Sequence, residues 1–297
     1  MALQGTTRIA SCSDDKTLRI WNLETAMCEL ILEGHSDSVN SVVFSHNSQK
    51  IVSTSCDMTV RVWNVNSGEC QHVLNGHVGY VVSAVFSHNS QKVASASFDM
   101  SIRIWDMETG DCERILEGHS DGVWSVDFSH DSKKVASGSD DETIRIWDAD
   151  TGAHQQSLEG HVDSVTSVTF SQDSKRLISA SADNDIRIWD TDTGACEQII
   201  SHSNDVEFMS FSNDLKWVSF AAADGTICIW NIDTGRFDQI LEGHREAICS
   251  AVFSSGSNMV ASGSYDRTVR IWSIETGECV RLLQGHDDCV NSVTFSF

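Results

Sequence analysis

The sequence lacks proline altogether and is poor in basic side chains: 20 Lys and Arg stand against 43 Asp and Glu, a formal net charge of −23. Because phosphate backbones are bound by clustered Lys and Arg, this charge argues against a nucleic-acid partner. It argues equally against docking on an anionic membrane surface. No apolar run is long enough for a transmembrane helix, and residues 1–20 contain no apolar signal-peptide core. We therefore expect a chain that binds neither nucleic acid nor membrane.

The ten cysteines contain no C-x-x-C pair, so a strong zinc or redox motif is missing. Five of them stand seven residues after a recurring tryptophan: Cys28, Cys70, Cys112, Cys196 and Cys279. Equivalent positions in separate repeats should lie well beyond the ~7 Å Cα limit for a disulfide. Free thiols predict a reducing compartment, the cytoplasm, with the nucleus as an alternative.

A repeat runs through the whole chain, with Trp recurring at intervals of 42 residues and once of 41. The first six recurring His each precede a Trp by 28 residues, Asp lies six residues before every Trp, and Ser lies ten residues before six of the seven. In repeat order these positions are Ser11, Asp15 and Trp21 with His286; His35, Ser53, Asp57 and Trp63; His77, Ser95, Asp99 and Trp105; His119, Ser137, Asp141 and Trp147; His161, Ser179, Asp183 and Trp189; His202, Asp224 and Trp230; and His244, Ser262, Asp266 and Trp272.

Each repeat has the pattern of four short strands. In the first full repeat, alternating apolar residues predict strands at 39–44, 50–55, 59–63 and 70–74, with polar turns between them. Four strands with Gly-His and Trp-Asp or Trp-Asn resemble a WD-repeat (WD40) propeller blade, and the resemblance covers the whole chain.

The resemblance implies an all-β fold, a seven-bladed β-propeller of four-stranded antiparallel blades, in one domain over residues 1–297. Residues 286–297 would supply one strand of the seventh blade and residues 1–33 the others. Pairing of the C-terminal strand with the N-terminal strands would then close the ring and remove open sheet edges. Since the chain holds almost nothing besides repeats, we expect it to be a propeller excised from a longer parent protein.

In WD-repeat proteins the recurring His, Ser or Thr, Asp and Trp form a buried hydrogen-bonded tetrad, and the resemblance implies this structural role here. Trp only donates and Asp only accepts, whereas Ser and neutral His do both, so the four can satisfy one another without water. The fifth full repeat departs from this pattern, with Phe220 in place of Ser and Ser201 in place of the Gly before His. We expect an incomplete network there, which makes that blade either the weakest or the most specialised.

Several short motifs resemble catalytic sites but fall in repeat phase. Asp-Thr-Gly recurs at 150–152, 192–194 and 233–235, where a hairpin turn is needed. Residues 118–122 fit a G-x-S-x-G pattern, which requires a strand-to-helix turn that an all-β repeat does not supply. His46, His88 and His130 stand in turns of separate blades, so we expect solvated side chains rather than metal ligands. The sequence therefore predicts no enzyme, no cofactor and no metal.

Three columns vary while the framework repeats: three residues after His, five after His, and the residue before the tetrad Asp. In WD-repeat proteins these columns line the top face around the channel and commonly contact partners. Aromatic residues gather there in neighbouring blades, which is typical of a binding hot spot, although packing between blades is the alternative. The candidate partner-binding residues are Tyr80, Val82, Phe98, Met100, Trp124, Tyr265, Asp140 and Glu207. Acidic residues in the same columns favour a basic peptide or protein as ligand.

These observations favour a non-catalytic interaction module, monomeric on its own, that binds a peptide or protein. A glycan-binding lectin or an enzyme is less well supported, because the aromatics are confined to a few blades and no nucleophile–base pair stands outside the repeat phase. Phe-Ser-His-Asp-Ser-Lys-Lys at 128–134 and the recurring Leu-Glu-Gly-His resemble the C-terminal sensor propellers of fungal NACHT or NB-ARC NOD-like receptors. That resemblance implies the recognition domain of a larger signalling protein. The alternative is a general scaffold, such as a histone-tail reader or a ubiquitin-ligase substrate receptor.

Overall fold

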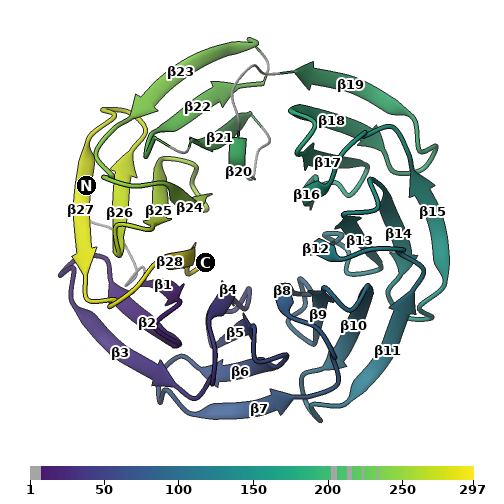
Figure 1. Cartoon of the computed structure of the whole chain (residues 1–297), viewed down its shortest axis with the longest axis horizontal. Helices are drawn as coiled ribbons and strands as arrows, with labels where there is room; N and C mark the ends of the chain where they lie inside the picture. Colours follow the sequence, from purple (N-terminus) through teal and green to yellow (C-terminus); the bar gives the residue numbers. More distant parts are fainter. Residues whose placement is uncertain (1–7, 202–205, 213–215, 223, 233) are drawn as a thin grey trace. The chain divides into compact units, whose positions relative to one another are not determined.

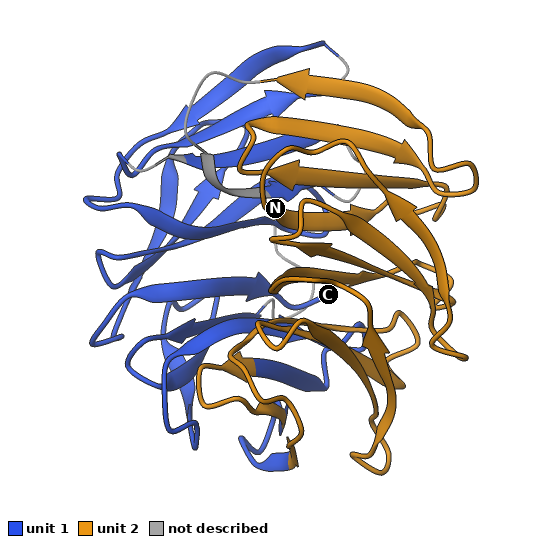
Figure 2. Ribbon diagram, turned by 45° about the vertical axis from the view of Figure 1, so that its right-hand side comes forward, with its two compact units in different colours: residues 1–53, 63–71, 206–297 blue, residues 54–62, 72–205 orange. Residues whose placement is uncertain are grey.

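The computed structural model describes residues 8–201, 206–212, 216–222, 224–232 and 234–297. In this part of the chain every regular element is a β-strand, and the strands form seven sheets of four strands each (Figure 1). The expected all-β, seven-bladed propeller fold is confirmed. Contacts divide the chain into two compact units (Figure 2): unit 1 is residues 1–53, 63–71 and 206–297, and unit 2 is residues 54–62 and 72–205. The single domain over 1–297 stays a prediction.

Unit 2 contains three complete sheets, each a meander of antiparallel strands that pair in chain order. The strands are β8 (Val81–Phe86), β9 (Lys92–Ser97), β10 (Ser101–Asp106) and β11 (Cys112–Glu117); β12 (Val123–Phe128), β13 (Lys134–Ser139), β14 (Ile144–Asp148) and β15 (His154–Leu158); and β16 (Val165–Phe170), β17 (Arg176–Ser181), β18 (Asp185–Asp190) and β19 (Cys196–Ser201).

Unit 1 contains two further meanders and one sheet built from both ends of the described chain. The meanders are β20 (Val206–Phe211), β21 (Trp217–Ala222), β22 (Ile227–Asn231) and β23 (Arg236–Leu241); and β24 (Ile248–Phe253), β25 (Met259–Ser264), β26 (Thr268–Ser273) and β27 (Cys279–Gln284). The third sheet has the order β28 (Val290–Phe295), β1 (Arg8–Ser13), β2 (Thr17–Asn22) and β3 (Cys28–Glu33). The seventh sheet, β4 (Val39–Phe44), β5 (Lys50–Ser55), β6 (Val60–Asn64) and β7 (Cys70–Leu74), has residues in both units.

The C-terminal strand completes the sheet of the N-terminal strands, as predicted. Strand β28 runs antiparallel to β1, with Ile9 opposite Phe295 and Ser11 opposite Val293. Just beyond this ladder, the Ser296 amide donates to the Arg8 carbonyl at 2.9 Å. The sheet is therefore held at this edge by hydrogen bonds between strands that no hairpin connects.

The hydrophobic cores lie between neighbouring sheets and follow the alternation of the strands. One core joins Ile102 and Leu116 of the β8–β11 sheet to Val126, Phe128 and Trp147 of the β12–β15 sheet, all of them buried. Strand β13 is buried on both faces and carries small residues, because the next sheet approaches closely. A Cβ added at Gly138 would lie 2.7 Å from Cγ1 of Val165.

Side chains on the innermost strand of the β12–β15 sheet also accept hydrogen bonds from backbone amides on the innermost strand of the β16–β19 sheet. The Val168 amide donates to Ser125 Oγ at 3.1 Å, and the Phe170 amide donates to Asp127 Oδ2 at 2.8 Å. These amides lie on the free edge of the innermost strand β16, so they need such acceptors. Burial raises the pKa of the Asp127 carboxyl to about 7, although the Phe170 and Phe128 amides oppose the shift.

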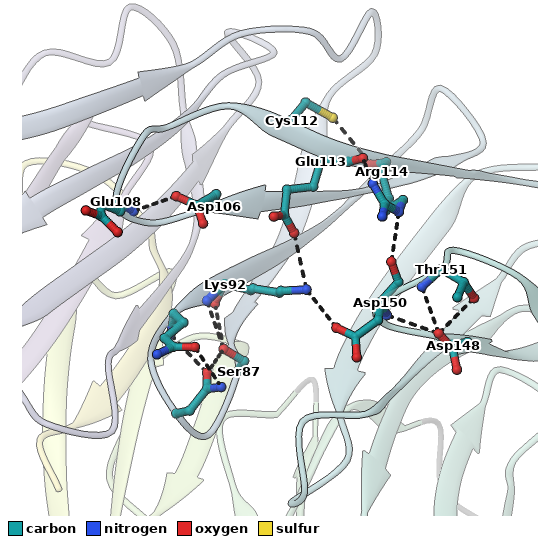
Figure 3. Close-up of polar contacts among 12 residues, drawn as sticks. Ser87, Lys92, Asp106, Glu108, Cys112, Glu113, Arg114, Asp148, Asp150 and Thr151 are labelled. Carbon is teal, nitrogen blue, oxygen red and sulfur yellow. Dashed lines mark hydrogen bonds and ion pairs between the residues drawn. The ribbon is translucent and has the colours of Figure 1, made fainter.

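An ion-pair network joins the β8–β11 sheet to the β12–β15 sheet (Figure 3). Lys92 Nζ lies 3.2 Å from Glu113 Oε2 of its own sheet and 3.0 Å from Asp150 Oδ1 of the next. Arg114 Nε donates to the Asp150 carbonyl at 2.9 Å. Because Asp150 is 76% exposed, each pair contributes at most about 1 kcal/mol. The network fixes how the neighbouring turns meet more than it adds stability.

Candidate functional site

The tetrads are the buried polar framework on which the variable positions stand. In the β8–β11 sheet, Trp105 Nε1 donates to Ser95 Oγ at 2.8 Å, and Ser95 Oγ lies 2.8 Å from His77 Nε2. His77 Nδ1 lies 2.7 Å from Asp99 Oδ2. Since Trp can only donate and ionised Asp only accepts, the Ser hydroxyl donates to a neutral His that carries its proton on Nδ1. One direction of donation satisfies all four groups.

Four other sheets repeat this arrangement with distances between 2.7 and 3.0 Å. Their members are Ser11, Asp15, Trp21 and His286; His119, Ser137, Asp141 and Trp147; His161, Ser179, Asp183 and Trp189; and His244, Ser262, Asp266 and Trp272. In the β4–β7 sheet, Ser53 Oγ lies 2.8 Å from both His35 Nε2 and Trp63 Nε1. Asp57 accepts the Thr59 amide at 3.0 Å.

The tetrad carboxylates are held ionised. Burial alone would raise the pKa of Asp99, but hydrogen bonds from His77, Ser101 and the Val78 amide outweigh it and hold this pKa well below its usual range. The pKa values of Asp15, Asp141, Asp183 and Asp266 are lowered by the same balance. Burial lowers the pKa of His161, which favours the neutral ring. These side chains are occupied with one another, which fits the structural role implied by the resemblance.

The β20–β23 sheet departs from the framework, as expected. Buried Phe220 stands at the Ser position, and Trp230 Nε1 is buried with no hydrogen-bond partner among the described residues. Asp224 is exposed and accepts the Thr226 amide at 3.0 Å. His202 lies outside the described residues. The incomplete network is thus confirmed at Trp230.

The expected replacement of the Gly before His by Ser201 is wrong. Ser201 lies opposite Asp185 in the β18–β19 ladder, as Glu117 lies opposite Ser101 in the β10–β11 ladder, so Ser201 takes the last position of its strand. The residue missing from this shorter repeat is therefore the Gly itself. Elsewhere that Gly packs against an Arg of the third strand: a Cβ on Gly118, at φ 153°, would lie 2.9 Å from Arg145 Nη1. In the β20–β23 sheet Cys228 takes the place of that Arg, so the Gly and the Arg are lost together.

Five of the candidate residues lie in one region of unit 2, and we call Tyr80, Phe98, Met100, Trp124 and Asp140 the aromatic surface. The rings of Tyr80 and Phe98 lie 6.5 Å apart, and those of Phe98 and Trp124 lie 4.7 Å apart, edge to face. Trp124 Nε1 donates to Asp140 Oδ1 at 2.6 Å. Tyr80 is 48% exposed, Met100 46% and Trp124 38%, whereas Phe98 is half-buried between the other two rings.

Backbone hydrogen bonds explain why distant columns meet there. The Phe98 amide donates to the Tyr80 carbonyl at 3.0 Å, and the Asp140 amide donates to the Gly122 carbonyl at 2.9 Å. The loop after His is thereby tied to the turn before the tetrad Asp. A Cβ on Gly122 would lie 2.8 Å from Cδ1 of Phe98, so the absence of a side chain at residue 122 makes room for that ring. The side chains of the aromatic surface therefore pack against one another and are also partly exposed to solvent.

The remaining candidates are not placed in this group. Val82 is half-buried on β8. Tyr265 belongs to unit 1 and is 53% exposed, with its amide bonded to the Ala247 carbonyl at 3.0 Å. Glu207 lies on β20, but its side chain is outside the described part of the chain. Their role in partner binding stays a prediction.

Two of the motifs that resemble catalytic sites form a turn and a loop. The Gly152 amide donates to the Asp148 carbonyl at 2.9 Å, so Asp-Thr-Gly at 150–152 closes a hairpin. In the loop at 118–122, the Ser120 amide donates to the tetrad carboxylate of Asp141 at 3.0 Å. The repeat phase therefore accounts for both motifs.

The turn histidines stand on separate sheets, as expected, but one pair is in ring contact and not simply solvated. His88 and His130 belong to neighbouring sheets, yet their rings lie 4.0 Å apart, because turns of adjacent sheets meet at this end. The described residues contain no group of three or more His, Cys, Asp or Glu arranged to hold a metal ion. Within the same residues, no helix has the length and apolarity to cross a membrane.

Comparisons with known proteins fit this geometry. A family model described as WD domain, G-beta repeat, matches residues 4–22, 26–64, 235–273 and 277–297. A model described as IFT122 first beta-propeller matches residues 80–234, just over half of the chain. A Lissencephaly-1 homolog of Caenorhabditis briggsae is 47% identical over 36 residues, which span 12% of this chain and 9% of that protein. The likeness to that relative thus covers a single repeat-sized segment.

Proposed function

Because the chain belongs to the WD40-repeat family of β-propellers, we propose that it is a non-catalytic module that recognises a peptide or protein segment through the aromatic surface. The exposure of Tyr80 and Trp124 beside a half-buried Phe98 carries this proposal, and Met100, two residues after Phe98, is exposed as well. Large aromatic side chains with a polar handle supply much contact area at low entropic cost. The propeller fold itself supports interaction rather than any particular partner.

The charge around the aromatic surface favours a ligand with a basic side chain. Asp140 accepts the Trp124 indole with Oδ1, and Asp121 is exposed in the loop before β12. A Lys or Arg of a partner would face both a carboxylate and aromatic faces, which attract cations. The net charge of −23 would speed the approach of such a ligand at low salt.

In the cell, the module would be the sensor of a larger signalling protein, in the manner of the NOD-like receptors that its repeats resemble. The alternative is a general scaffold, such as a histone-tail reader or a ubiquitin-ligase substrate receptor. A nucleotide-binding P-loop domain encoded in the same gene would support the sensor. Its absence from the full-length gene would favour the scaffold.

Peptide-display selection on the purified chain tests the binding proposal. Enriched peptides should combine Lys or Arg with an apolar side chain. Their affinity should fall about thirtyfold in the Tyr80→Ala/Trp124→Ala variant, as for a hot spot of about 2 kcal/mol. Ile115→Ala is the matched control, since Ile115 is 48% exposed on β11 of the same unit. Equal affinity for the aromatic variant and the wild-type chain would contradict the proposal.

A further inference from the structure

Two thiols of unit 1 lie in contact at the junction of two sheets. Cys249 stands on β24, and Cys289 directly precedes β28; their Sγ atoms are 3.2 Å apart and 40 residues separate them in sequence. Cys289 is 2% exposed, whereas Cys249 is half-buried. Both cysteines are free thiols in the structure.

The surrounding backbone holds this pair in place. The Val293 amide of β28 donates to Ser250 Oγ of β24 at 3.3 Å, which fixes one strand against the other. The Asp14 amide donates to the Cys289 carbonyl at 3.1 Å. A disulfide needs a sulfur–sulfur distance of about 2 Å, so the sulfurs would approach by only about 1 Å.

We propose that Cys249 and Cys289 form a reversible disulfide that fastens the C-terminal strand β28 to the neighbouring sheet under oxidising conditions. Cys249 stands five residues after His244, and Cys289 stands three residues after the next recurring His, His286. These two positions meet at the junction of the sheets. Asn291, five residues after His286, behaves alike: its Nδ2 donates to the Val39 carbonyl of the following sheet at 3.0 Å. The column five after His thus reaches the next sheet.

The chemistry is thiol–disulfide exchange with a low-molecular-weight disulfide such as oxidised glutathione. The more exposed Cys249 attacks as the thiolate, forms a mixed disulfide and releases one small thiol. Cys289 then gives up its proton to solvent and attacks the Cys249 sulfur, which expels the second small thiol. Two protein thiols are oxidised and one small disulfide is reduced to two thiols. The hydrogen bond with Cys249 and burial raise the pKa of Cys289, which makes it the resolving rather than the attacking thiol.

The disulfide would stabilise the sheet that combines β28 with the N-terminal strands β1–β3. Strand β28 has no hairpin to β1, so its ladder with β1 joins segments from opposite ends of the chain. A covalent link at Cys289, beside the first residue of β28, would hold this end of β28 against β24 of the neighbouring sheet even when the ladder with β1 opens. Closing a loop of this length should raise the melting temperature of a chain of this size by about 6 °C.

Equilibration of the purified chain in glutathione buffers tests the proposal, with acid quenching, alkylation and peptide mapping by mass spectrometry. The wild-type chain should lose two hydrogen atoms, yield a Cys249–Cys289 cross-linked peptide, and exchange the amides of 290–295 more slowly. Cys289→Ser should stop at a mixed disulfide on Cys249, with no rise in melting temperature. Cys196→Ser, at an exposed thiol, is the matched control and should behave as wild type.

Two results would overturn the proposal. The first is full alkylation of Cys249 and Cys289 after equilibration in the most oxidising buffer. The second is a cross-linked chain whose melting temperature and exchange at 290–295 equal those of the reduced chain, which would remove the fastening role. Neither readout depends on partner binding, so the result is separate from the proposed function.

Discussion

Comparing a complete with an incomplete tetrad measures the contribution of one hydrogen bond to the free energy of unfolding. Trp147 Nε1 donates to Ser137 Oγ at 3.0 Å, whereas Trp230 Nε1 is buried without a partner in the described part of the chain. The substitution Trp→Phe removes a hydrogen bond at residue 147. At residue 230 it removes a buried N–H group that makes no hydrogen bond. We therefore expect Trp147→Phe to destabilise the chain more than Trp230→Phe.

The magnitude follows from the two local environments. Both substitutions lose indole contacts, and the loss is larger at residue 147, because Trp147 is 2% exposed whereas Trp230 is half-buried. Trp147→Phe also loses a net hydrogen bond of about 1 kcal/mol. Trp230→Phe relieves a buried unsatisfied donor, whose cost is about 1–3 kcal/mol. The hydrogen-bond effects alone set a difference between the variants of about 2–4 kcal/mol, or roughly 3–6 °C in melting temperature for a chain of this length, and the packing difference adds to it.

Thermal melts followed by far-UV circular dichroism measure this difference directly, since the sheet signal reports on the whole fold. Urea titrations supply a second estimate, and an unchanged dependence on denaturant shows that both variants unfold from a native-like state. Ser137→Ala should lower the free energy of unfolding more than Trp147→Phe does, because it leaves both Trp147 and His119 without their hydrogen-bond partner. Equal losses for Trp147→Phe and Trp230→Phe would show that the tetrad hydrogen bond carries no stability, and our reasoning would be wrong.

Two further predictions rest on the same measurement. The raised pKa of Asp127 means that the stability of the folded chain falls as pH rises from about 4 through 7. The Asp127→Asn side chain can still accept the Phe170 amide but carries no charge. This variant should therefore melt at a higher temperature than wild type near pH 8, but not near pH 4. The lowered pKa of Asp141 has the opposite sign: its stabilisation is intact above about pH 4 and is lost as pH falls further, so Asp141→Asn should flatten the acid loss of melting temperature.

The sequence was sufficient for the fold because its repeats constrain every level at once. The resemblance to WD-repeat blades implied the tetrads, and Trp, Asp, Ser and His are residues that can satisfy one another in one direction of donation. Strand β28 could be matched to β1 because the last repeat stops after one strand and the first begins with the second. The defect at Trp230 followed from Phe220 in the Ser column.

Contacts between sheets were harder to predict. His88 and His130 meet although their repeats are separate, and Cys249 meets Cys289 from a different column. Such contacts depend on the approach of one sheet to the next, which periodicity within a repeat does not report. The bond from Trp124 to Asp140 likewise depends on a side-chain rotamer that the surrounding packing selects.

The pairing of β28 with β1 also has a mechanical consequence. Ile9 at the start of β1 lies opposite Phe295 at the end of β28, so both outward-leading ends of the chain leave the ladder at the same place. Tension applied through these ends would load the hydrogen bonds one after another, as in a zipper, and not all together in shear. This sheet is therefore where a pulling force would first open the molecule, and it would yield at low force because each step breaks only the outermost pair.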